Sequence, residues 1–380
     1  MTATEESPMY ARAADGVRAL RPYEPGMPIE ELERQLNVKD VIKMASNENP
    51  LGASPKVVEA VRRELTRGDL ARYPDGGGFR LKHKLAAFWN IEPERITLGN
   101  GSSDILEFVA RIFLRPDHAA MFSQYAFAVY PLATTAQSAP ASVVPALPPG
   151  HAQMPYGHDL DGFAARLDAN VGAIFLANPN NPTGTWLPAS AVEQFLQKVP
   201  PHVPVVLDQA YAEYQDAALQ VDARPLLDRF PNLVVARTFS KAYGLAGLRV
   251  GYGLSSPAMA DLMNRIRPPF NVNALALLAA EVALDDEEHV ARSVQLNRSE
   301  RDALRKDLEG MGLRVLPSQA NFLTIDFGRD SAPVHRRLLE AGIILRPMAS
   351  YGMPHFLRAT VGTAGQNARL VAAFKSVLDG

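Results

Sequence analysis

From about Ile96 to Leu254, short apolar runs alternate with helix-patterned segments. Most of the runs are apolar throughout, which is typical of strands covered on both faces. The segments between them, such as residues 103–114 and 190–198, carry apolar positions at helical spacing. The predicted strands are Ile96–Leu98, Ala119–Phe122, Ser142–Pro145, Gly172–Ala177, Val203–Leu207, Leu233–Thr238 and Val250–Leu254. This alternation predicts an α/β fold with a large doubly wound, mostly parallel sheet.

The last third of the chain has a different pattern. His289–Met311 is a long, charge-rich amphipathic segment, and short strand-like runs follow it around a helix-like Pro333–Ala341. Those runs are Leu313–Leu316, Phe322–Phe327, Ile343–Leu345 and Leu357–Val361, and a predicted helix over Gln366–Leu378 ends the chain. We therefore expect a small α+β domain over residues 273–380, a large domain over residues 46–272, and an N-terminal arm over residues 1–45 that packs on the small domain.

Composition excludes several kinds of site. The formal net charge of −2 over 380 residues indicates neither a nucleic-acid partner nor an anionic membrane. The absence of cysteine excludes disulfides and thiolate chemistry, and the eight histidines show no metal-ligand spacing. No apolar run approaches the ~20 residues that span a bilayer, and residues 1–20 lack the apolar core of a secretory signal. We expect a cytoplasmic protein without a bound metal.

Polar or glycine-rich segments follow predicted strands, at the edge where open α/β sheets bind ligands. Gly99–Asp104 opens a helix whose first N–H groups can bind a phosphate, although an ordinary strand–helix turn is the alternative. It lacks the third glycine of a dinucleotide fingerprint. Asn178–Gly184 is stiffened by two prolines and can aim Asn amides at a ligand, or it is only a rigid turn.

Charged side chains end two further strands. Asp208 follows Val203–Leu207 and needs a partner, because an unpaired buried carboxylate is costly; capping the next helix is the alternative. Thr238, Ser240 and Lys241 leave the next strand together, and Arg249 follows eight residues later. A lysine crowded between strand ends loses hydration, which lowers its pKa toward the neutral, nucleophilic amine.

In order and spacing, these motifs resemble the signature of the fold-type I pyridoxal-phosphate-dependent aminotransferases. The matching elements are Asn181-Pro-Thr-Gly, Asp208-x-x-Tyr211 and Ser240-Lys241 with Arg249. Further segments narrow the resemblance to the histidinol-phosphate aminotransferases, from about Val17 to the C-terminus. They are Asn47-Glu-Asn-Pro-Leu-Gly52, Tyr73-Pro-Asp-Gly76, Gly99–Ser103, Arg237–Lys241, Gly244–Arg249 and Leu357–Gly362.

The resemblance implies pyridoxal 5'-phosphate as cofactor and gives each residue a role. Lys241 is expected to hold the cofactor as a Schiff base and to act as general base and acid. Asp208 is expected at the pyridine N–H, with Tyr211 and Asn181 at the ring oxygen. Phe127 is the expected stacking ring; Tyr125 is the second choice, and core packing is the alternative for both.

The same resemblance assigns the phosphate and the subunit arrangement. The backbone of Ser102 and Ser103, the hydroxyls of Thr238 and Ser240, and Arg249 are expected to bind the cofactor phosphate. Tyr73 is expected to reach that phosphate from a partner subunit, so the resemblance implies a homodimer with shared active sites.

Substrate recognition is assigned to five residues that lie far apart in the sequence. The expected substrate-binding residues are Tyr23, Asn47, Asn181, Arg346 and Arg358. Two guanidinium groups can bind either a phosphate or a carboxylate, because both anions accept the same fork of donors; a structural ion pair is the alternative. Asn321 is expected to line the site or to cap a strand. The implied reaction moves an amino group between L-histidinol phosphate and 2-oxoglutarate in histidine biosynthesis.

Two features of the sequence depart from the family pattern. Gln209 stands where many members carry Glu, next to the expected pyridine contact, and Ser102-Ser103-Asp104 stands where Ala-Asp-Glu is common.

Three rival functions are compatible with the same fold. An aromatic amino-acid aminotransferase shares the chemistry, since apolar pockets discriminate side chains by only ~1–3 kcal/mol. A phosphothreonine-type decarboxylase is the second rival, and a non-catalytic ligand-sensing module is the third.

Overall fold

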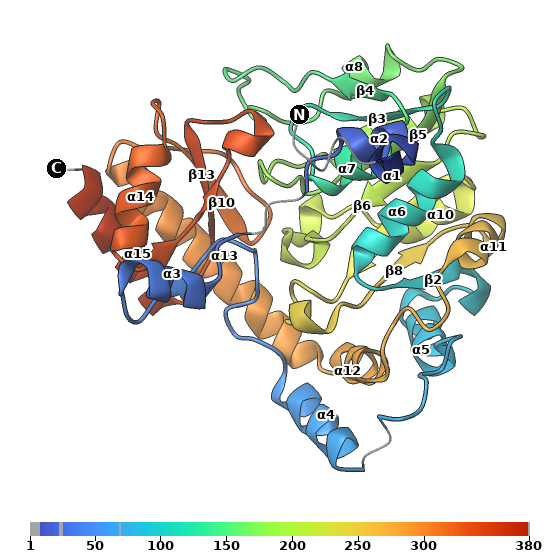
Figure 1. The fold of residues 1–380 in the computed structure, drawn as a ribbon, viewed down its shortest axis with the longest axis horizontal. Coiled ribbons are helices and arrows are strands. Elements are labelled where there is room, and N and C mark those ends of the chain that lie inside the picture. Colours follow the sequence, from blue (N-terminus) through green and yellow to red (C-terminus); the bar gives the residue numbers. More distant parts are fainter. Residues whose placement is uncertain (1–7, 23–25, 68–69, 379–380) are drawn as a thin grey trace.

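The computed structural model describes residues 8–22, 26–67 and 70–378, and its larger part is built on a seven-stranded sheet (Figure 1). The strand order is β2-β8-β7-β6-β5-β3-β4. The bounds are β2 Ile96–Gly99, β3 Ala119–Ser123, β4 Ala141–Val144, β5 Val171–Ala177, β6 Val205–Asp208, β7 Leu233–Thr238 and β8 Gly251–Leu254. The five neighbouring strands β4, β3, β5, β6 and β7 pair in parallel. β8 pairs antiparallel with both β7 and β2. The predicted mostly parallel α/β sheet is confirmed.

Continuous burial of the central strands explains their unbroken apolar runs. Residues of β5 alternate between two apolar clusters: Ile174 and Leu176 lie in one, and Ala173 and Phe175 lie in the other. Successive side chains of a strand point to opposite faces, so each cluster is the core on one side of the sheet. Both faces must therefore be covered by helices.

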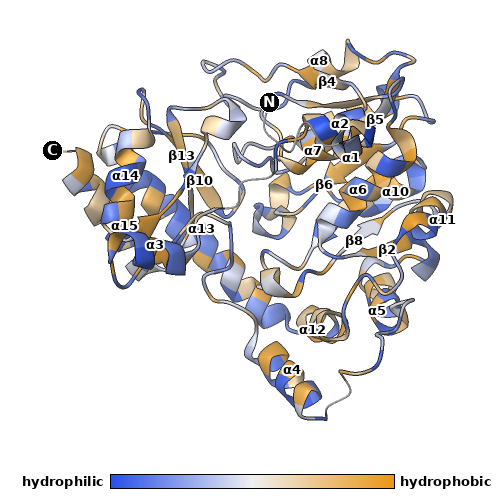
Figure 2. Ribbon diagram, viewed as in Figure 1, coloured by the Kyte–Doolittle hydropathy of each residue, from blue (hydrophilic) through white to orange (hydrophobic). Residues whose placement is uncertain are grey.

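The helices on the large sheet come mainly from the connections between its strands (Figure 1). The bounds are α4 Pro55–Arg67, α5 Phe79–Trp89, α6 Ser102–Phe113, α7 Val129–Ala136, α8 Leu160–Ala164, α9 Ala189–Lys198, α10 Ala223–Arg229, α11 Pro257–Ile266 and α12 Ala274–Leu284. Figure 2 shows hydrophobic and hydrophilic residues mixed along most of these helices, as expected where one stripe is buried. α12 differs, because it packs on α4 and α5 and most of its side chains are buried.

The smaller part is a four-stranded sheet in the order β12-β13-β10-β9, packed with helices (Figure 1). Its elements are α13 Glu287–Gly310, β9 Arg314–Val315, β10 Phe322–Asp326, α14 Ala332–Glu340, β11 Ile343–Ile344, β12 Arg346–Pro347, β13 Phe356–Thr360 and α15 Ala364–Leu378. β10 pairs antiparallel with β13 and with β9, and β12 pairs antiparallel with β13. The long α13 runs from this sheet toward α12. It therefore joins the two parts of the molecule.

The N-terminal residues divide their contacts between the two parts. α3 (Ile29–Leu36) precedes β1 (Ile42–Lys43), which pairs in parallel with β11 of the small domain. α1 (Pro8–Arg12) comes first in the described chain, and α2 (Asp15–Ala19) lies instead against α7, where the Gly16 N–H donates to Ser138 Oγ at 2.9 Å. The expected arm over residues 1–45 thus rests on both parts. The boundary expected at residue 273 also leaves α12 on the small-domain side, although α12 packs on the large domain.

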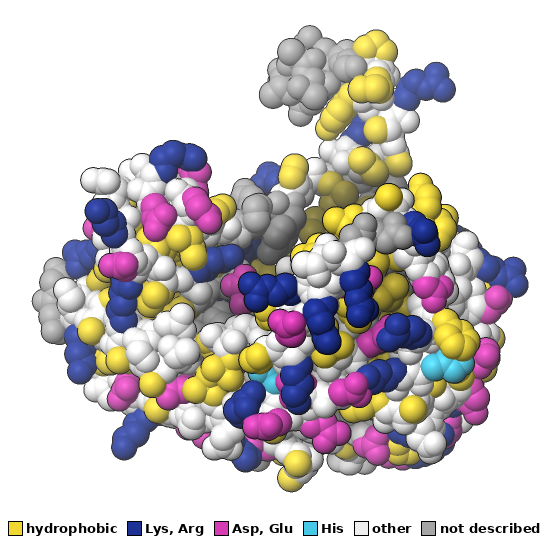
Figure 3. Space-filling model, turned by 90° about the horizontal axis from the view of Figure 1, so that it is seen from below, with side chains coloured by type: hydrophobic (Ala, Val, Ile, Leu, Met, Phe, Trp, Pro, Cys, Tyr) yellow, Lys and Arg dark blue, Asp and Glu magenta, His cyan; other side chains and the backbone are white. Residues whose placement is uncertain are grey.

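Figure 3 shows acidic and basic side chains interleaved on the face seen from below. Within the described ranges, no helix is long and apolar enough to cross a membrane.

Candidate functional site

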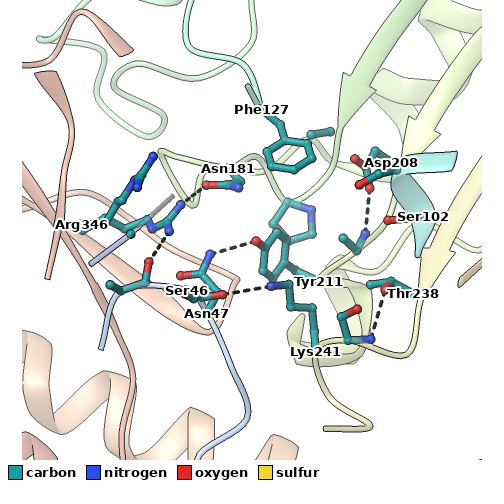
Figure 4. A pocket seen from close by; sticks show the side chains of 18 of the residues that line it. Ser46, Asn47, Ser102, Phe127, Asn181, Asp208, Tyr211, Thr238, Lys241 and Arg346 are labelled. Atoms are coloured by element: carbon teal, nitrogen blue, oxygen red, sulfur yellow. Dashed lines mark hydrogen bonds between the residues drawn. The ribbon is translucent and has the colours of Figure 1, made fainter. Parts of the chain in front are cut away.

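A pocket lies between the carboxyl ends of the central strands and the small domain (Figure 4). β5, β6 and β7 are adjacent, so Ala177, Asp208 and Thr238 end at one edge of the sheet. Segments 45–47 and strands β12 and β13 face that edge. The lining residues are Gly26, Ala45, Ser46, Asn47, Ser102, Ser103, Phe127, Ala177, Pro179, Asn181, Asp208, Ala210, Tyr211, Thr238, Ser240, Lys241, Arg249, Arg346, Tyr351 and Arg358. Of the predicted catalytic, cofactor-binding and substrate-binding residues that the structure describes, the pocket gathers all except Tyr73.

Lys241 enters the pocket just beyond β7. Its Nζ donates to Ser46 O at 3.2 Å and lies 5.7 Å from the centroid of the Tyr211 ring. Burial, followed by the positive charge of Arg358, lowers the pKa of Lys241 to about 8. At this pKa, part of the Lys241 amine is neutral near physiological pH, and the neutral amine is the nucleophilic form.

Asp208 is almost fully buried at the end of β6, and Tyr130 holds it. The Tyr130 hydroxyl donates to Asp208 Oδ2 at 2.9 Å, and the Ala210 N–H donates to Oδ1 at 3.2 Å. Burial raises the pKa of Asp208, while these two donors and Lys241 oppose the rise. Tyr130 was not predicted from the sequence. Its position three residues after Phe127, just inside α7, could have indicated that it lies near the site.

The first turn of α6 and three side chains form a cradle for an anion. The N-cap of α6 is Gly101, whose φ is 79° and whose missing Cβ leaves space that Arg249 fills. Arg249 Nη1 donates to Ser240 Oγ at 3.3 Å, and the Ser240 N–H donates to Thr238 Oγ1 at 3.1 Å. A helix N-terminus beside a guanidinium and hydroxyls is a site for a phosphate group.

On the opposite wall, two arginines stand on adjacent strands. Arg346 and Arg358 are cross-strand partners in β12 and β13. Arg358 donates to Asn181 Oδ1 and, at 2.8 Å, to Ala45 O. Because a guanidinium only donates, Asn181 presents its acceptor oxygen to Arg358, and its amide Nδ2 is the group left to donate into the pocket.

Tyr211 meets the pocket from the segment after β6. Burial raises the pKa of Tyr211 to about 12, although the charge of Arg358 and a hydrogen bond from Asn47 lower it. That bond joins Asn47 Nδ2 to Tyr211 Oη at 2.9 Å. Asn321 donates to Asn47 O at 3.0 Å, so its side chain supports the pocket wall.

The remaining aromatic predictions have different positions. Phe127 lines the pocket, whereas Tyr125 packs edge-on against Tyr156. Tyr73 lies outside the pocket of its own chain: its side chain is 81% exposed and its ring stacks on Phe270 at 4.6 Å. Tyr23 lies outside the described residues. Across those residues, no group of three or more His, Asp or Glu could hold a metal ion.

Taken together, the pocket suits a ligand with two anionic groups. Arg249 stands beside the start of α6, Arg346 and Arg358 stand on β12 and β13, and Lys241 lines the same pocket. Ser46 and Tyr351 also line the pocket, although neither was predicted from the sequence. The arrangement can hold a flat phosphate-bearing molecule against an amine nucleophile and bring a second anion to that amine.

The chain matches the family described as aminotransferase class I and II over residues 39–374. It is 53% identical to histidinol-phosphate aminotransferase 2 of Pseudomonas fluorescens strain Pf0-1 over 370 residues, which cover 97% of this chain and 98% of the relative. It is 51% identical to histidinol-phosphate aminotransferase 2 of Pseudomonas aeruginosa strain PAO1 over 374 residues, which cover 98% of this chain and 99% of that relative.

The fold is similar to that of a crystal structure of histidinol-phosphate aminotransferase from Sinorhizobium meliloti in complex with pyridoxal 5'-phosphate. The TM-score is 0.87 at 29% sequence identity, and the match covers 97% of this chain and 98% of that chain. The likeness therefore extends over both domains.

Proposed function

This chain belongs to the aminotransferase class I and II family, and from that premise we propose that it transfers an amino group between L-histidinol phosphate and 2-oxoglutarate. The products would be imidazole-acetol phosphate and glutamate. The observation that carries the proposal is the pair of arginines, Arg346 and Arg358, facing the pocket that contains Lys241. A place in cytoplasmic histidine biosynthesis follows from this substrate and is part of the proposal.

The residues present fit pyridoxal 5'-phosphate. The first turn of α6 and the donors of Arg249, whose guanidinium occupies the space left by Gly101, form a site for its phosphate. Pyridoxal phosphate, when bound, supplies an aldehyde that condenses with amines and a protonated ring that withdraws electrons from the reacting carbon. Asp208 would hold the proton on the ring nitrogen, and Tyr211 and Asn181 would donate to the ring oxygen.

Lys241 does the proton transfer in this proposal. Its pKa of about 8 lets Nζ take up a proton and return it near neutral pH, because the driving force is balanced when the pKa lies close to the working pH. Phe127 lines the pocket beside these groups and would cover one face of the ring. Covering the ring also excludes water from the reacting carbon.

The substrate would extend past the arginines into a neighbouring hollow. This hollow shares Gly26, Arg346 and Tyr351 with the pocket and has apolar walls that include Met27 and Leu132. The guanidinium pair would bind the phosphate of histidinol phosphate or a carboxylate of glutamate, since both match its donors. An apolar wall accepts an imidazole or a phenyl ring with little discrimination.

Donor preference tests the proposed substrate. Purified cofactor-loaded protein is mixed with histidinol phosphate, histidinol or phenylalanine, and the absorbance change of the bound cofactor is followed. Histidinol phosphate should react fastest, and histidinol should be slower by roughly 10²-fold, because it lacks the phosphate that the guanidinium groups bind. A faster reaction with phenylalanine would indicate an aromatic amino-acid aminotransferase instead.

The proposal includes a homodimer with shared active sites. Tyr73 is 81% exposed, and Val58, Leu65, Leu70 and Phe79 nearby in the sequence are also exposed. Large apolar side chains concentrated in one exposed segment are typical of a surface that a partner covers. A second copy of the chain would cover them and bring Tyr73 toward the phosphate cradle of its partner.

Mixing two defective variants tests the shared site. Tyr73→Ala lacks the residue given to the partner, and Lys241→Ala lacks the amine of its own site. A mixed dimer has one site with both native residues, so equal mixing after subunit exchange should restore about a quarter of wild-type activity. If Tyr73 acts only within its own chain, the mixture will show just the average of its two parents.

A further inference from the structure

Asn47 has a backbone and a side chain that are both fixed by neighbours. Its φ is 56°, in the left-handed region that asparagine tolerates better than most residues. The residue is only 1% exposed. Its N–H donates to Thr360 Oγ1 at 2.9 Å, and its carbonyl accepts from Asn321 at 3.0 Å. The last residue of β13 and the residue that precedes β10, both in the small domain, therefore hold Asn47 against the large domain.

These contacts determine which end of the Asn47 amide faces Tyr211. Thr360 Oγ1 accepts from the Asn47 N–H, so its own proton is available to donate to Asn47 Oδ1 at 3.3 Å. With the amide oxygen directed at Thr360, Nδ2 is the end that meets Tyr211 Oη, at 2.9 Å. The phenol oxygen therefore accepts from Asn47, and the phenol's own proton is left to be donated elsewhere.

We propose that Asn47 is a positioning residue that turns the Tyr211 proton into the pocket, toward the ring oxygen of the cofactor. This inference rests on the proposed function. Asn47 lines the pocket, and its contact with substrate, expected from the sequence, is still a prediction. Its amide, however, is already directed at Tyr211. The small domain would thus set the direction of a hydrogen bond made by a residue of the large domain.

The test uses Asn47→Gly, because glycine adopts a positive φ without strain and removes the side chain that carries the amide. A donor at the ring oxygen withdraws electron density, so the nitrogen that joins Lys241 to the cofactor becomes harder to protonate. Losing that donor should therefore raise the pH midpoint of the absorbance change of bound pyridoxal phosphate. We expect a rise of about one pH unit, the size of one hydrogen bond. Asn37→Gly, an exposed residue with φ of 50°, is the matched control and should leave the midpoint unchanged.

The second arm repeats the substitution in Tyr211→Phe. If Asn47 acts through the Tyr211 hydroxyl, Asn47→Gly shifts the midpoint in the native background and leaves it unshifted in Tyr211→Phe. Equal shifts in both backgrounds, or none in either, would overturn the proposal. Asn47→Asp should shift the midpoint further than Asn47→Gly, because a carboxylate accepts the phenol proton and turns it away from the pocket. Wild-type protein that gives no cofactor absorbance at all would instead refute the proposed function.

Discussion

Lys241→Ala should lower turnover by roughly 10⁴-fold while the protein still binds pyridoxal phosphate noncovalently. The phosphate cradle and Asp208 remain in the variant, so binding persists, but the amine that attaches the cofactor and carries the proton is lost. Turnover with histidinol phosphate and 2-oxoglutarate measures the loss directly.

Borohydride reduction locates the amine independently of turnover. In wild-type protein, peptide mapping after reduction should place a pyridoxyl label on Lys241, and the variant should carry none there. Lys306→Ala, which removes an exposed lysine of α13, is the matched control and should keep both the label and the activity. A label on another lysine of the wild-type protein would contradict the assignment.

Asp208→Asn should lower kcat by roughly 10²-fold with little change in folding. The amide has the size of the carboxylate: its oxygen can accept from the Ala210 N–H while its nitrogen donates to the Tyr130 hydroxyl oxygen. It carries no charge, however, to hold a proton on the ring nitrogen. Because burial already disfavours the charged carboxylate, removing its charge should not unfold the protein. Steady-state kinetics and thermal unfolding of the apoprotein measure the two effects separately.

Tyr130→Phe is a milder change at the same carboxylate, for comparison with Asp208→Asn. It removes the hydrogen bond at Oδ2 and keeps the carboxylate, so it should lower kcat by only about tenfold. Near-native kcat in Asp208→Asn would mean that the ring nitrogen does not need the Asp208 carboxylate to keep its proton. That result would require a different electron sink in the mechanism.

The sequence predicted the central strands well because their environment is extreme. β5, β6 and β7 are buried along their whole length, so their segments are apolar throughout and end abruptly where polar residues begin. Asn181, Asp208 and Lys241 follow those ends, and parallel strands bring such residues to one edge of the sheet. Their gathering in one pocket could therefore be expected before the structure.

The neighbours of two helices could not be predicted from the sequence, for a physical reason. α12 is apolar around most of its circumference, which indicates burial without indicating what buries it. The structure places it on α4 and α5, whereas the sequence boundary assigned it to the small domain. Likewise, α2 carries no pattern that distinguishes α7 from the small domain as its partner.

By itself, the amino-acid sequence determined the α/β architecture, the strand ends that carry chemistry and the family of the chain. Only the tertiary structure decided which polar groups meet. Tyr130 and Asp208 lie 78 positions apart, and Asn47 and Tyr211 lie 164 apart. Strand burial leaves a local, periodic record in the sequence, because every residue of the strand contributes to it. A hydrogen bond between distant segments depends on two single residues and on how whole domains pack, so no local pattern records it.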